Sequence, residues 1–120
     1  MKAVILAVVA VALAGVVWAG GGWSTSHSLA GGTVAVTNAQ ANSSWAPVAV
    51  FIRYPVTCTG TVEVRRVSQG LDLAVGSCVF ANVSSLVWIP DAAFSFQYGD
   101  ALVIRSSETN GVVQLMRRGE

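Results

Sequence analysis

The sequence predicts an all-β protein: an antiparallel β-sandwich or small barrel of seven to eight short strands, preceded by one N-terminal hydrophobic helix. Three observations support this fold class. Lys2 is the only charged residue among the first 19. From Thr33 onward, no window keeps the period of an amphipathic helix. Short runs rich in β-branched residues alternate there with turn residues, at the spacing typical of sandwiches and barrels.

The N-terminal segment, residues 1–19, predicts a membrane-spanning helix. Residues 3–19 form an unbroken apolar run of 17 residues, at the short end of the roughly 17–25 that cross a bilayer. The residues expected to anchor it are Ala3, Leu6, Leu13 and Trp18, the last at the interface with water. A Gly/Ser-rich linker is expected over residues 20–32, and the β-domain over residues 33–120.

A cleaved signal peptide is the alternative interpretation of the same segment. The short basic start, the apolar middle and the sequence Val17-Trp18-Ala19 fit a cleavage site. A retained segment would instead anchor the protein in a membrane or pack as a helix between subunits. The sequence leaves these alternatives open.

The β-domain is expected to contain eight short strands. Proline stands near the start and after the end of the second, where strands tolerate it. The strands are expected at Thr33–Thr37, Ala46–Tyr54, Thr61–Val67, Leu71–Val75, Leu86–Ile89, Phe94–Phe96, Ala101–Ser106 and Val112–Arg117.

Two hairpins are predicted. In the first, a four-residue loop over residues 67–70 pairs Val64 with Leu73 and places Arg65 opposite Asp72 on the solvent face. In the second, Asn110-Gly111 is a strong two-residue turn signal that pairs Ile104 with Arg117.

Cys58 and Cys78 are the only cysteines and flank the first hairpin. In the expected register they miss each other by one residue, which a bulge at Gly60 or Gly76 would correct. A disulfide is favoured if the domain lies outside the cytoplasm. Two buried thiols are the alternative, and they are favoured in a reducing compartment.

No residue pattern indicates catalysis, a cofactor site or a metal site, and we expect the protein not to be an enzyme. His27 is the only histidine and lies in the expected linker, which fixes neither an acid nor a nucleophile beside it. Two cysteines and one distant histidine do not make a metal site. No phosphate-binding or dinucleotide-binding motif occurs.

The aromatic side chains offer one candidate interface. Phe94, Phe96 and Tyr98 would share one face of a strand, because side chains alternate with a period of two. Packing in the core is the alternative for these rings. Arg117 and Arg118 could contact an anion, although such terminal pairs are more often solvated.

The chain carries little charge. Charged residues make up 11% of it, against roughly 25% in a typical soluble domain. No lysine follows Lys2, so the strand edges lack the residue that most often protects them from pairing with another chain. This composition favours a surface covered by protein subunits or lipid, and the alternative is a genome bias in codon use. A net charge of +1 does not indicate specific nucleic-acid binding.

The stretch Ile89–Arg118 resembles the last strands of small β-domain structural proteins of bacteriophage virions. Gly99-Asp100, Ala101–Ile104 and Asn110-Gly111 carry this resemblance. It implies a virion structural protein without enzymatic activity.

We therefore expect a non-enzymatic assembly subunit, associated with a bacteriophage capsid or anchored in a virion membrane. Its expected partners are protein subunits of the same assembly, with lipid at the N-terminal helix. The alternative is an exported bacterial β-sandwich that binds a partner in the periplasm or at the cell surface.

Overall fold

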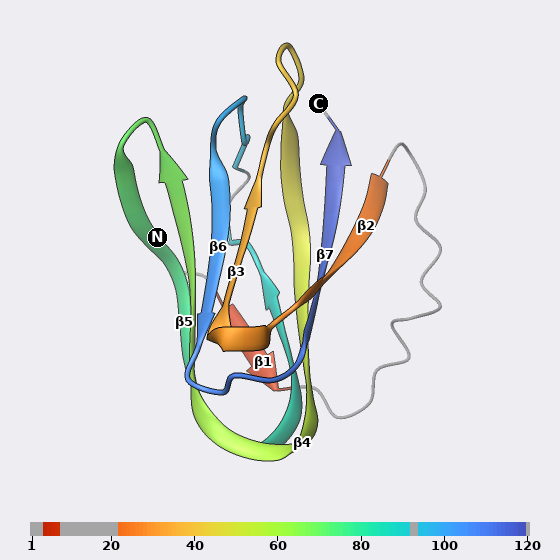
Figure 1. Cartoon of the computed structure of the whole chain (residues 1–120), viewed down its shortest axis with the longest axis vertical. Coiled ribbons are helices and arrows are strands. Elements are labelled where there is room, and N and C mark those ends of the chain that lie inside the picture. Colours follow the sequence, from red (N-terminus) through yellow and green to blue (C-terminus); the bar gives the residue numbers. More distant parts are fainter. Residues whose placement is uncertain (1–3, 8–21, 92–93, 120) are drawn as a thin grey trace.

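The computed structural model describes residues 4–7, 22–91 and 94–119. These residues form one curled antiparallel sheet of seven strands (Figure 1), which confirms the prediction of an all-β fold. The strands are β1 (Val4–Ala7), β2 (Gly22–Ser28), β3 (Thr33–Thr37), β4 (Trp45–Ser68), β5 (Leu71–Ile89), β6 (Ala101–Ser106) and β7 (Val112–Gly119).

Strand β4 runs through both halves of the curled sheet. Its first part, from Trp45 to Arg53, pairs with β7, whereas its second part, from Val62 to Val67, pairs with β6. Strand β5 follows β4 along both parts. One half of the sheet therefore has the order β1-β5-β4-β7-β2, and the other has the order β5-β4-β6-β3.

Two predicted strands merge into β4, and two others merge into β5. Pro55 was expected to end a strand, but β4 continues through it. The register with β5 shifts between Arg53 and Cys58, and this irregularity is where a proline without an N–H group is tolerated. The chain therefore bends here while remaining extended.

The two halves enclose one hydrophobic core. Strand β3 alternates buried and exposed residues, as the period of two requires. Strands β6 and β7 meet in the core without pairing to each other. The fully buried side chains include Val50, Ile52, Val62, Val64, Leu86, Trp88, Phe96, Leu102, Ile104, Val113 and Leu115.

The first predicted hairpin is present with a different register. The turn has two residues, Gln69 and Gly70, both with positive φ, rather than the expected four. Leu73 consequently lies opposite Arg66, not Val64. A bulge at Val75 shifts the register again. A prediction that assumes a strict alternation of side chains could therefore not give the observed register. Arg65 lies opposite Ala74, not opposite Asp72 as expected, but its Nε atom still contacts Asp72 Oδ1 at 2.6 Å.

The second predicted hairpin is wrong. Asn110-Gly111 belongs to the connection that crosses from β6 in one half of the sheet to β7 in the other. Each strand pairs instead with its own part of β4. The local turn signal is overridden because both strands gain more pairing and burial from β4 than from each other.

Two segments expected to be a helix and a linker contain strands. Val4–Ala7, part of the expected N-terminal helix, forms β1 and pairs with Leu86–Ile89. Gly22–Ser28, part of the expected linker, forms β2 and pairs with β7 over its whole length. Serine and threonine side chains suit an edge strand with one solvated face. The same composition is typical of a linker, which is why the sequence predicts one here.

Gly31 and Gly32 supply a matched pair for testing the tight turn before β3. Both have positive φ, at 81° and 83°. A Cβ atom at Gly31 would meet nothing within 4 Å, but one at Gly32 would lie 2.7 Å from the backbone oxygen of Ser106. We expect Gly31→Ala to lower the free energy of unfolding by about 1 kcal/mol and Gly32→Ala to lower it by at least ~1 kcal/mol more. Urea unfolding measures both, and equal losses would contradict the close approach.

His27 in β2 makes stability depend on pH. Its Nε2 atom lies 2.8 Å from Thr25 Oγ1. Burial, and secondly the charge of Arg117, lower the pKa of His27 below its usual 6.5. The unfolded chain therefore binds more protons between that lowered pKa and 6.5, and stability is lost as the pH falls through this interval. We expect His27→Gln to flatten the dependence of the urea midpoint on pH below 6.5. An unchanged slope would show that His27 is not its source.

Candidate functional site

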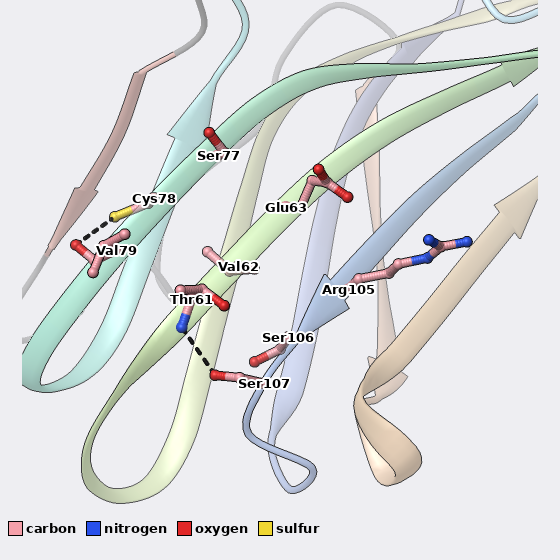
Figure 2. A pocket seen from close by; sticks show the side chains of 9 residues that line it. All are labelled: Thr61, Val62, Glu63, Ser77, Cys78, Val79, Arg105, Ser106 and Ser107. Atoms are coloured by element: carbon pink, nitrogen blue, oxygen red, sulfur yellow. Dashed lines mark hydrogen bonds between the residues drawn. The ribbon is translucent and has the colours of Figure 1, made fainter.

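A groove lies over the second half of the sheet, where β5, β4 and β6 run side by side (Figure 2). Its volume is about 630 Å³. Thr61 N donates a hydrogen bond to Ser107 Oγ at 2.9 Å, and Ser107 N donates to Thr61 O at 2.9 Å. Gly60 has no Cβ atom, which leaves room for the Ser107 hydroxyl. The groove is lined by Thr61, Val62, Glu63, Ser77, Cys78, Val79, Arg105, Ser106 and Ser107.

The groove lacks the parts of a nucleophilic catalyst. Burial raises the pKa of the Cys78 thiol, which favours the weakly nucleophilic protonated form. The single histidine, His27, pairs with Val113 in the other half of the sheet. Glu63 is held by Arg65 in an ion pair of 2.8 Å. These side chains make the groove a polar surface rather than a site with an activated base.

The two cysteines do not meet. Cys58 lies opposite Val83, and Cys78 lies opposite Val62. Four residues of β4 therefore separate their positions, roughly 13 Å at the rise of a strand, whereas a disulfide needs Cα atoms within about 7 Å. Both thiols are free. Both are partly buried, whereas the alternative that the sequence left beside a disulfide was two buried thiols.

The expected aromatic row is not formed. Phe96 is fully buried and stacks on Trp45 with 4.6 Å between ring centroids, Phe94 is partly buried against the core, and Tyr98 is exposed. The segment is not a continuous strand, because only Phe96 forms a bridge, to Trp45. The two-residue period therefore does not apply to these three rings.

An aromatic–arginine stack, which the sequence did not reveal, runs across one end of the fold. Arg117 lies between two tryptophans, with its guanidinium carbon 5.1 Å from the Trp23 ring centroid and 4.8 Å from that of Trp45. Trp45 stacks on Phe96, and Arg66 lies 5.3 Å from the Phe96 centroid and 6.0 Å from that of Phe94. We call Trp23, Arg117, Trp45, Phe96, Arg66 and Phe94 the aromatic–arginine stack.

Hydrogen bonds hold the Arg66 end of this stack. Arg66 Nη2 donates to Ser95 O at 2.8 Å and lies 3.8 Å from Asp100 Oδ2. Asp100 is buried, and it accepts hydrogen bonds from Ser68 Oγ and from Gln97 N. The buried Asp100 carboxylate therefore positions an arginine.

The first part of β5, from Leu71 to Phe80, has a free edge. It pairs with β4 on one side, and in the described ranges no strand pairs with its other side. Leu71, Leu73 and Val79 are 63%, 57% and 83% exposed. We call this segment the free β5 edge.

Of the four expected membrane anchors, Ala3, Leu13 and Trp18 lie outside the described residues. Leu6 lies in β1, opposite Val87 of β5. Within residues 4–7, 22–91 and 94–119, no helix is long and apolar enough to cross a membrane.

Comparisons with known proteins identify no family. No protein-family model matches the chain, and neither does any curated protein. Among solved structures, the chain resembles the core of Drosophila NLP, which was described for pentamer formation and histone binding. The match covers 82% of this chain and 97% of that chain, with 10% sequence identity and a TM-score of 0.48.

The prediction of a bacteriophage virion subunit is contradicted. The solved structure reported above, the Drosophila NLP core, is not a bacteriophage protein. Of the helix that the membrane-anchored form of that prediction requires, Val4–Ala7 is a strand, and residues 1–3 and 8–19 lie outside the described residues. At 10% identity, the similarity assigns neither pentamer formation nor histone binding to this chain.

Proposed function

We propose that this chain is a non-enzymatic domain that associates with a second copy of itself through the free β5 edge. The observation that carries the proposal is a strand edge with which no strand of the described residues pairs, and which bears three exposed apolar side chains, Leu71, Leu73 and Val79. Unpaired N–H and C=O groups along a strand are a template for another strand. Antiparallel pairing of two β5 edges around a twofold axis would give hydrogen-bond partners to the N–H and C=O groups of both edges.

The charges around this edge favour a second copy over a charged partner. Asp72 is the only charged residue in the free β5 edge, and Arg65 neutralises it through the contact between Nε and Oδ1. Arg65 also pairs with Glu63. Each edge would bring only one net negative charge from these three side chains, whereas a strongly acidic partner would be repelled and a strongly basic partner would find only that single charge.

The absence of an activated nucleophile in the groove supports a binding role. The thiol and hydroxyl side chains that line the groove are those of Cys78, Thr61, Ser77, Ser106 and Ser107. None has a histidine beside it, because His27, the single histidine, lies on β2. A nucleophile of this kind needs an adjacent base or a lowered pKa, and burial moves the pKa of Cys78 upward.

The double variant Leu71→Asp/Leu73→Asp tests the proposal. Burying a leucine contributes about 1.5–3 kcal/mol, so losing two at a symmetric interface is expected to weaken self-association at least tenfold. Sedimentation equilibrium over a concentration series measures the dissociation constant of the native chain and of the variant.

Val112→Asp is the matched control, because Val112 is 48% exposed but starts β7 in the other half of the sheet. We expect this control to self-associate as the native chain does. A native chain that is monomeric at all concentrations would overturn the proposal, and so would equal weakening by the control.

A further inference from the structure

A cleft lies beside the Arg117 end of the aromatic–arginine stack. Its volume is about 340 Å³, at the lower end of the range for small-molecule pockets. No acidic side chain of the described residues lines it. The lining residues are Trp23, Thr37, Asn38, Ala39, Gln40, Trp45 and Arg117, and we call this the Arg117 cleft.

Arg117 is a buried charge whose bonding is incomplete. It is 9% exposed, and its Nη2 atom donates to Thr25 Oγ1 at 3.0 Å. Its buried Nε atom has no hydrogen-bond partner, and no carboxylate of the described residues forms an ion pair with it. An unpaired buried charge is costly, and the two tryptophan faces offset only part of that cost.

The part of the cleft lining that contains Asn38 and Gln40 is held in place by hydrogen bonds. Asn38 Nδ2 donates to Ser43 O at 3.0 Å and to Phe96 O at 2.8 Å, and Gln40 N donates to Asn38 Oδ1 at 3.1 Å. The backbone of Asn38 also pairs with that of Asp100. The cleft is therefore formed before any ligand binds, which lowers the entropic cost of binding.

We propose that the Arg117 cleft binds a small organic carboxylate that carries an apolar ring. A planar carboxylate matches the donor geometry of a guanidinium and would supply the missing negative charge. Trp23 is 39% exposed and offers a ring face to the apolar part of such a ligand. The uncharged lining from Thr37 to Gln40 does not repel an anion. This inference is independent of self-association through β5.

Benzoate and its neutral analogue benzamide test the proposal on the full-length chain. Proton–nitrogen NMR follows the Arg117 Nε–H and the Trp23 indole N–H signals during titration. We expect benzoate to shift both signals saturably, and benzamide to bind at least roughly tenfold more weakly, because a hydrogen bond to a charged group is stronger than one to a neutral group. Shifts that stay linear in concentration, or that are equal for the two compounds, would overturn the proposal.

Two variants separate the cleft from a general effect of positive charge. Trp23→Ala keeps Arg117 and removes the exposed ring face, so benzoate should bind several-fold more weakly while the rest of the spectrum stays dispersed. Arg118→Gln removes the neighbouring exposed charge on the same strand and should leave binding within about twofold. A loss of binding in Arg118→Gln as large as in Trp23→Ala would assign the effect to the terminal charges and overturn the cleft.

Discussion

The continuity of β4 through both halves of the sheet is the constraint on which the rest of the fold depends. Because β4 presents one part to β7 and another to β6, the last two strands are recruited to opposite halves. The irregular pairing between Arg53 and Cys58 lets the strand bend without breaking. Side chains from both parts of β4, such as Ile52 and Val64, then face the same core. Without this bend, the sheet would leave one apolar face exposed.

The aromatic–arginine stack is a consequence of the same topology. Trp45 begins β4, Arg66 lies near its end, and the stack joins them through Phe96. A guanidinium is weakly hydrated and flat, so it loses less than an ammonium would when aromatic rings replace water on its faces. Arg66 gains Asp100 as a counterion, whereas Arg117 has no acidic partner among the described residues. The two arginines of the stack therefore differ, because among the described residues Arg66 has a carboxylate counterion and Arg117 does not.

Local patterns predicted the short strands in which buried and exposed positions alternate. They failed where contacts between residues far apart in the sequence decide which strands pair. Thr33–Thr37 and Ala101–Ser106 have the predicted bounds because each is a short, mostly apolar run between clear turns, with buried residues at alternate positions. Asn110-Gly111 indicated a hairpin, but pairing with β4 overrode that local preference. Trp23, Trp45 and Arg117 meet from three strands, β2, β4 and β7. No spacing in a single sequence encodes such a meeting, so the stack and its cleft could not be predicted.

The surface carries fewer exposed, unpaired charged side chains than the composition suggests. The chain has seven basic and six acidic residues, but Asp100 and Arg117 are buried. Arg65 contacts both Glu63 and Asp72, so these three charges leave a net charge of only −1 where they lie. These charged side chains therefore hold their neighbours in place and add little net charge to the solvent-exposed surface. A domain arranged in this way gains more than an ordinary one from covering an apolar strand edge, because few charged groups must be dehydrated in the process.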